Sequence, residues 1–177
     1  MIHPKMPRAI NLQFASYLWY CLRIVSGKRN AQRRSGCPVS ISLERLGDRW
    51  SLLIIRDLMV RALHSFKEFQ ESGEGIATNI LANRLHKLEA DGIITAEAGQ
   101  TDARKVIYRL TEKGIDLAPV ILELLVWAAR HENTDAPCAL VAGMAAEREK
   151  VLAEVRRRWG ERDPTPLQLK SGEWQWP

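Results

Sequence analysis

Between residues 37 and 131, apolar residues recur at helical spacing in several short stretches. The first stretch begins at Pro38, which suits the first turn of a helix, and Cys37 is the expected cap. This pattern predicts a short amphipathic helix that ends near Gly47 and whose apolar stripe consists of Ile41, Leu43 and Leu46.

Two more helices are expected before residue 71. Asp48 is a plausible cap for the second helix, whose apolar positions are Trp50, Leu53, Ile54 and Leu58. Ser65 and Glu68 have the spacing of a capping box, which predicts a third helix with Phe66 and Phe69 turned inward.

The stretch "ATNILANRLHKLEADGII", residues 77–94, predicts a fourth helix that ends at Gly92. Its core-facing residues are Ile80, Leu81, Leu85 and Leu88. Two β-type runs follow, at 93–97 and 105–110, and the residues between them have the character of a hairpin loop.

The run from Thr111 to Glu132 predicts another helix, which Pro119 should kink or divide into two. Its second half is apolar almost all round, so we expect it to pack on the domain and on a second subunit. The predicted dimer interface consists of Val120, Ile121, Leu124, Leu125 and Trp127.

One further helix is predicted from residue 136 to about Trp159, with Leu152, Val155 and Trp159 on one stripe. The tail beyond it is Pro-bearing and contains Trp174 and Trp176.

The predicted fold is mainly α with a small β-hairpin, a winged helix-turn-helix with extra N- and C-terminal helices. Three regions are expected. Residues 1–36 form a basic N-terminal extension, 37–131 the winged domain with its dimerisation helix, and 132–177 a C-terminal helix and extended tail.

The face of the helix at 77–91 opposite its apolar stripe carries Asn79, Asn83 and His86. Asparagine can donate to and accept from an adenine edge in the major groove, and the second helix of a helix-turn-helix presents its N-terminal part to the bases. We therefore expect Thr78, Asn79 and Asn83 to contact bases. A solvated helix face is the alternative for this helix taken alone.

Basic residues flank that face. Arg84 and Lys87 are placed to reach phosphates, which position a protein without specifying sequence. In the predicted wing, 98–104, Arg104 with the adjacent Lys105 can meet the flanking backbone or the minor groove.

The net charge is +5, and a basic balance favours nucleic-acid binding. The distribution of the charge along the chain weakens this inference. Residues 1–36 hold seven basic residues and no acidic one, which leaves the remaining 141 residues at net −2. The apolar segment 9–25 within this extension has three interpretations: an extra helix, a translated upstream region outside the working protein, or an export signal.

The residue spacing offers no support for an enzyme, a metal site or a cofactor site. Cys21, Cys37 and Cys138 form no CxxC pair, and the four histidines show no metal-binding spacing. No phosphate-binding glycine loop and no nucleophile motif occurs. Unpaired cysteines suit a reducing cytoplasm, where we expect the protein to act without a membrane partner.

Four blocks of the sequence resemble the HxlR-type bacterial transcription regulators: "CPVSISLERLGDRWSLLIIRDL", "SFKEFQ", "IATNILANRLHKLEADGII" and "YRLTEKGIDLAPVILELLVWA". The resemblance runs from Cys37 to about Trp127 and implies a homodimeric winged-helix protein on double-stranded operator DNA. Ala77 stands where many relatives have serine, so Thr78 could supply the cap instead. "QTDARK" stands where many relatives have a Pro-rich wing.

The resemblance also implies a role for Cys37, since some members of this family sense oxidants or electrophiles through a cysteine at this position. A thiol at a helix N-terminus near Arg33 and Arg34 should ionise more readily than a free one. The alternative is a small buried capping residue without a signalling role.

Two function classes therefore remain open. The first is a sequence-specific DNA-binding transcription regulator, and the second is a winged-helix module for protein–protein contact. A small-molecule effector at the dimer interface is compatible with either, although no residue cluster identifies one.

Overall fold

A computed structural model describes residues 35–99 and 104–167. The chain divides into two units, Met1–Cys37 and Pro38–Pro177, and the described helices and strands lie in the second. The expectations for segment 9–25, for Cys21 and for the two C-terminal tryptophans, Trp174 and Trp176, fall outside the described residues.

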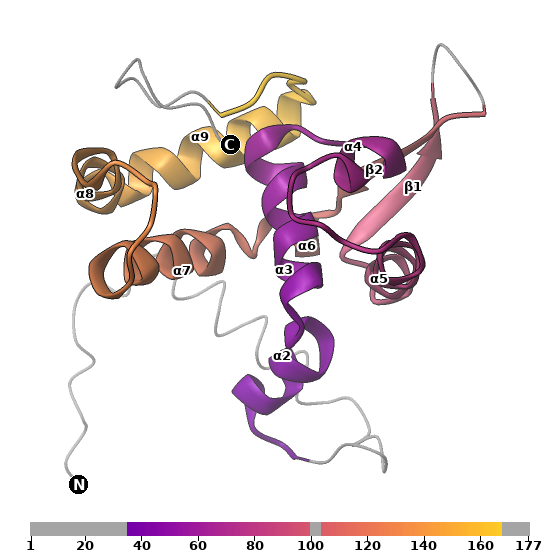
Figure 1. Cartoon of the computed structure of the whole chain (residues 1–177), viewed down its shortest axis with the longest axis horizontal. Helices are drawn as coiled ribbons and strands as arrows, with labels where there is room; N and C mark the ends of the chain where they lie inside the picture. The colour runs from indigo at the N-terminus through magenta and orange to yellow at the C-terminus, as the bar shows by residue number, and fades with distance from the viewer. Residues whose placement is uncertain (1–34, 100–103, 168–177) are drawn as a thin grey trace, which may run out of the picture. The chain divides into compact units, whose positions relative to one another are not determined.

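The described part of the second unit is mainly helical with one two-stranded sheet, as the sequence predicts (Figure 1). Its elements, in chain order, are α2 (Pro38–Leu46), α3 (Arg49–Arg56), the π-helix η1 (Asp57–Arg61), α4 (Phe66–Gln70), α5 (Thr78–Ala90), β1 (Ile94–Ala98), β2 (Val106–Leu110), α6 (Glu112–Ile115), α7 (Ala118–His131), α8 (Cys138–Ala146) and α9 (Arg148–Glu161). None of the helices in this described part has the length and apolarity that a membrane crossing requires.

Side-chain caps fix several helix starts, because they satisfy N–H groups that have no partner inside the helix. The Asp48 carboxylate accepts a hydrogen bond from the Ser51 N–H at 3.0 Å, which confirms it as the cap of α3. The predicted capping box of Ser65 and Glu68 is also present at the start of α4.

The stretch predicted as one helix after Asp48 changes from an α-helix to a π-helix at Asp57. There α3 passes into the π-helix η1, which ends at Ala62 in the left-handed conformation. The Asp57 carbonyl accepts the Leu63 N–H at 3.1 Å, and the buried Asp57 carboxylate contacts Arg56 and Arg61 on the same wide turn. Burial raises the pKa of this carboxyl despite the two guanidinium groups.

The main core lies where α3, η1, α4, α5 and the hairpin meet. Its most deeply buried side chains are Ile55, Phe69, Leu81, Leu85, Leu88, Ile93, Ile94 and Ile115. Three of them, Leu81, Leu85 and Leu88, form the predicted apolar stripe of α5, so the inward orientation of this helix is confirmed.

The hairpin pairs β1 with β2 in antiparallel register, from Ile94 opposite Leu110 to Ala98 opposite Val106. Beyond the last pair, the Gly99 N–H donates to the Lys105 carbonyl at 2.7 Å. At the other edge, the Tyr108 N–H donates to the His64 carbonyl at 2.7 Å, which attaches β2 to the segment before α4.

The helix predicted across residues 111–132 is divided into α6 and α7, with Pro119 in the first turn of α7. The predicted transition near the proline is therefore confirmed. Proline is tolerated there because the first N–H groups of a helix lack internal partners.

The single C-terminal helix predicted from residue 136 is wrong: the structure has two, α8 and α9, separated at Glu147. The α8 side chains Leu140, Val141 and Met144 pack with Leu122 and Val126 of α7 in a second apolar cluster. The predicted stripe of α9, Leu152, Val155 and Trp159, packs against the main core, and Leu152 also contacts the second cluster. The turn at Glu147 separates α8, which packs on α7, from α9, which reaches the main core.

Candidate nucleic-acid interface

Helices α4 and α5 form the helix-turn-helix, and two glycines in the turn between them have positive φ. Gly73 has φ of 88° and Gly75 has φ of 70°, a backbone region that side chains other than glycine rarely adopt. The turn therefore depends on glycine to bring α5 across α4.

The predicted base-contacting face of α5 points to solvent. Thr78, Asn79 and Asn83 are exposed, together with Ala82 and His86, while the opposite stripe is buried. The structure thus brings the expected base-contacting residues together on one open face near the start of α5.

Two of these residues already make local contacts at the helix start. Ala77 is the N-terminal cap residue and offers no side-chain hydrogen bond, so the expected cap by Thr78 is wrong. Thr78 lies inside the first turn, where its hydroxyl accepts a hydrogen bond from the Gln70 amide of α4 at 2.9 Å. The Asn79 side-chain oxygen accepts the Ile80 N–H at 3.0 Å.

The two flanking cations of α5 turn toward other helices. Arg84, with 27% of its side chain exposed, places Nε 3.0 Å from the Asp48 carboxylate, and Lys87 donates to the Glu44 carbonyl of α2 at 3.2 Å. Burial opposes ionisation of Asp48, but the hydrogen bonds from Ser51 and the positive charges of Arg84 and Lys87 outweigh it and lower the pKa. Sequence spacing alone did not reveal these structural partners.

At the wing, Arg104 and Lys105 are exposed beside the strand end. The Lys105 ammonium lies 3.4 Å from the Glu68 carboxylate of the capping box. Burial opposes ionisation of Glu68, but hydrogen bonds from the His64 and Ser65 N–H groups outweigh it and lower the pKa. Residues 100–103 of the predicted wing lie outside the described part of the chain.

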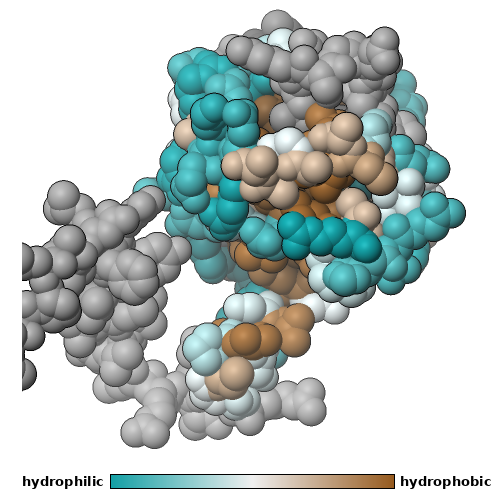
Figure 2. Space-filling model, turned by 90° about the vertical axis from the view of Figure 1, so that its left-hand side faces the viewer, coloured by the Kyte–Doolittle hydropathy of each residue, from teal (hydrophilic) through white to brown (hydrophobic). Residues whose placement is uncertain are grey.

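The predicted dimer residues of α7 divide into two sets. Val120, Leu124 and Trp127 are exposed, whereas Ile121 packs on the main core and Leu125 on the second cluster. Figure 2 looks onto the side that carries α7 and α8 and shows apolar surface there between hydrophilic margins.

An apolar patch on α2 was missed at the sequence level. Leu43, predicted on the inward stripe, is 61% exposed, and Val39 is 66% exposed. Of the expected stripe, Leu46 packs on the core and Ile41 is half-buried. The patch is visible on α2 at the lower end of Figure 2.

Cys37 carries a free, exposed thiol immediately before α2. Its backbone N–H donates to the Ser35 hydroxyl at 3.0 Å. Arg33 and Arg34, on which its expected ionisation depends, lie outside the described residues. Within residues 35–99 and 104–167, no group of three or more potential ligands could hold a metal ion.

Residues 45–136, just over half of the chain, match the family model of the HxlR-like helix-turn-helix. The HTH-type transcriptional regulator YybR of Bacillus subtilis (strain 168) is 34% identical over 110 residues, which cover 62% of this chain and 87% of YybR. YodB, an HTH-type transcriptional regulator of the same organism, is 40% identical over 104 residues, which cover 58% of this chain and 92% of YodB.

Solved structures are similar to this chain as well. The crystal structure of PA1607 superposes with a TM-score of 0.54 and 35% identity, over 61% of this chain and 74% of that one. The oxidised form of the redox regulator HypR superposes with a TM-score of 0.50 and 31% identity, over 55% of this chain and 100% of HypR. With a helix-turn-helix, a wing and these matches, the chain belongs to the HxlR-like helix-turn-helix family of transcription regulators.

Proposed function

We propose that the protein is a homodimeric, sequence-specific DNA-binding transcription regulator that lays α5 in the major groove of its operator. The observation that carries this proposal is the open face formed by Thr78, Asn79 and Asn83 on a helix whose opposite stripe is buried. Side chains on this face can approach base edges without any change in the core.

Asn83 is the main base-contacting residue in this proposal. An asparagine amide can pair with an adenine edge through two hydrogen bonds, which discriminates against other bases by about 1–3 kcal/mol. The Asn83 oxygen has one weak contact, from Arg84 Nη1 at 3.4 Å, and its side chain is exposed. Asn79 has first to release the Ile80 N–H that its oxygen accepts.

Arg84 and Lys87 act mainly by holding α5 against α3 and α2, and their charges raise the positive potential near the phosphates. Arg104 and Lys105 meet the flanking backbone or minor groove from the wing. For Lys105 this requires release of the Glu68 carboxylate, which a phosphate can replace.

The homodimer forms through the exposed apolar residues of α7, Val120, Leu124 and Trp127, together with the patch of Val39 and Leu43 on α2. Two-fold symmetry pairs the same surface of both subunits, and it would present two copies of α5 to the two halves of an operator. An interface of this kind covers apolar side chains that the single subunit leaves in water.

Cys37 makes the regulator responsive to oxidants or electrophiles. Its thiol is exposed and free, and HypR, a redox regulator, has a similar fold and 31% identity. Replacement of Cys37 by serine should leave DNA affinity unchanged under reducing conditions and abolish any loss caused by a mild thiol oxidant. An equal oxidant effect in the serine variant would refute this role.

The test of DNA binding is fluorescence anisotropy with DNA from upstream of the protein's own gene and with scrambled DNA, across a series of salt concentrations. We expect tight binding to one sequence that weakens steeply with salt, because phosphate contacts release counterions. If random DNA libraries also yield no preferred sequence at any salt concentration, the alternative of a protein–protein module is correct.

A further inference from the structure

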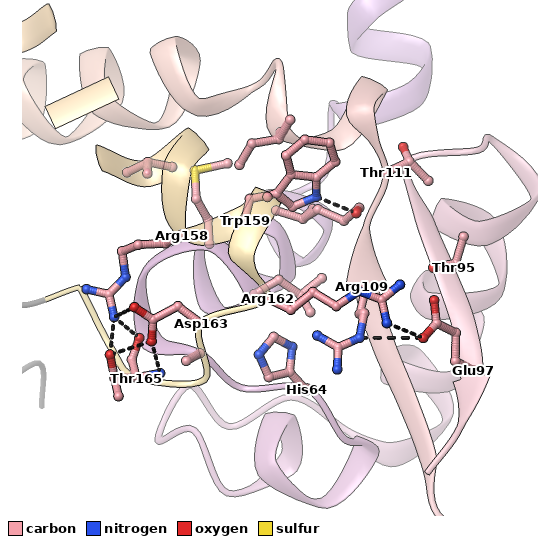
Figure 3. Close-up of a pocket in the computed structure, with 17 residues that line it drawn as sticks. His64, Thr95, Glu97, Arg109, Thr111, Arg158, Trp159, Arg162, Asp163 and Thr165 are labelled. Carbon is pink, nitrogen blue, oxygen red and sulfur yellow. Dashed lines mark hydrogen bonds and ion pairs between the residues drawn. The ribbon is translucent and has the colours of Figure 1, made fainter. Parts of the chain in front are cut away.

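A cavity of about 250 Å³ lies between the hairpin, η1 and the end of α9, and we call it the wing pocket (Figure 3). Its C-terminal wall, which includes Arg158, Trp159 and Arg162, lies beyond residue 136, where the family match ends. The cavity therefore combines residues of the matched domain with residues that lie C-terminal to it.

The inner surface of the wing pocket is apolar. It is lined by Leu58, Ile115, Val155 and Trp159, three of which belong to the buried core. The Trp159 indole N–H donates to the Leu110 carbonyl of β2 at 2.8 Å. This bond satisfies the one polar atom of the ring and fixes the indole against the wing strand.

The rim on the wing side carries an excess of positive charge. Nε of Arg109 lies 3.5 Å from Oε2 of Glu97, and Nη1 of Arg162 lies 3.6 Å from the same oxygen. Figure 3 shows both side chains reaching this one carboxylate. Two guanidinium groups at such distances share a single negative charge, and Nε of Arg109 is buried without a hydrogen bond.

The other charged groups that line the cavity do not neutralise the excess positive charge of Arg109 and Arg162. Arg158 is already used by Asp163, at 3.4 Å, and by Thr165, whose hydroxyl and carbonyl it contacts. His64 lines the cavity with Nδ1 3.1 Å from the Tyr108 carbonyl, and burial lowers its pKa, which favours the neutral ring. One monoanion between Arg109 and Arg162 would complete the charge balance.

We infer that the wing pocket binds a small carboxylate whose apolar body is about the size of one ring. The carboxylate lies between Arg109 of β2 and Arg162 at the end of α9, and the body lies against Trp159 and the core side chains. A cavity of about 250 Å³ is just below the usual size of sites for drug-sized ligands, which limits the occupant to a small molecule. The ligand would join the wing to the C-terminal extension.

The test is calorimetric titration of the full chain with benzoate, with its neutral isostere benzamide and with inorganic phosphate. Benzoate should bind at least about tenfold more tightly than either, because only benzoate offers both a charge and an apolar ring. Equal binding of benzamide would overturn the role of the arginines, equal binding of phosphate would overturn the role of the apolar surface, and no binding of benzoate would overturn the site itself.

Two variants locate the site. Arg162→Gln should weaken benzoate binding at least about tenfold, the loss expected for one charge-assisted hydrogen bond. The side chain of Arg162 is 58% exposed, so this change leaves the core intact. The matched control is Arg156→Gln, an arginine of α9 that pairs with Asp116 outside the cavity, and it should bind like the parent. Equal affinity of the Arg162 variant and the parent would overturn the inference. Because no DNA is needed, the outcome is independent of the proposed function.

Discussion

Nε of Arg84 lies 3.0 Å from Oδ1 of Asp48, the residue that caps α3. One carboxylate thus fixes the start of α3 and holds α5 beside it. Asp48→Ala removes both contacts, so we expect the free energy of unfolding to fall by about 1–2 kcal/mol, mostly from the lost cap. Urea denaturation measures this loss. The control Asp135→Ala, at an exposed loop position, should have no effect, and a parent-like Asp48 variant would contradict the assignment.

Local sequence signals predicted the starts of α3 and α4 well, because a cap and the N–H that it satisfies lie within three residues of each other. Asp48 with Ser51 and Ser65 with Glu68 are examples. The orientation of α5 was equally predictable from Leu81, Leu85 and Leu88, since helical spacing fixes which side chains share a face.

Features that depend on distant partners were not predictable in this way. Arg84 and Lys87 were expected to face phosphates, yet their partners, Asp48 and Glu44, lie on two preceding helices. Likewise, the spacing of Leu43 matched that of a buried residue, but α2 leaves it exposed. The turn at Glu147 and the wing pocket arise from the packing of α9 on the core, which no local pattern records.

Gly114 supports the junction between the hairpin and α6. A Cβ atom at this position would overlap the Ile93 carbonyl oxygen and lie 3.0 Å from Cδ2 of Leu110. We therefore expect Gly114→Ala to lower the free energy of unfolding by about 1–3 kcal/mol, as overpacking commonly does.

The matched control for this prediction is Gly143→Ala in α8, where nothing lies within 4 Å of the added Cβ. Alanine is the better helix former, so this variant should gain up to about 1 kcal/mol. Chemical denaturation of both variants gives the comparison. Equal effects of the two substitutions would show that the close approach at Gly114 does not constrain the fold.

His64 should make stability depend on pH. Burial lowers its pKa below the ordinary value of 6.5, and the charges of Arg109 and Lys105 act in the same direction. A lowered pKa in the folded state contributes stability above about pH 6.5, and this contribution is lost as pH falls through the folded pKa.

The prediction is tested with His64→Gln. At about pH 7 the free energy of unfolding of this variant should lie below that of the parent. This difference should narrow as pH falls to about 5, because only the parent must protonate a buried imidazole. His131→Gln, an exposed position of α7, is the control. A deficit that stays constant across this range would contradict the assigned direction of the pKa shift.

Leu124 tests the proposed homodimer. Leu124→Glu places a charge in the exposed apolar surface of α7, so we expect a shift from dimer to monomer at micromolar concentration, measured by light scattering after gel filtration. Val106→Glu, an exposed apolar position on β2 away from α7, should keep the mass of the parent. An unchanged mass for the Leu124 variant would place the dimer contact elsewhere.

The most direct test of the account is the effect of Asn83→Ala on operator binding, measured by fluorescence anisotropy against scrambled DNA. We expect the free energy of operator binding to become less favourable by about 1–3 kcal/mol, because the lost contact is to a base. Binding to scrambled DNA and the salt dependence of that binding should stay unchanged. Asn133→Ala, at an exposed position outside α5, should bind like the parent. If the Asn83 variant bound the operator as tightly as the parent, α5 would not recognise the operator sequence through this residue.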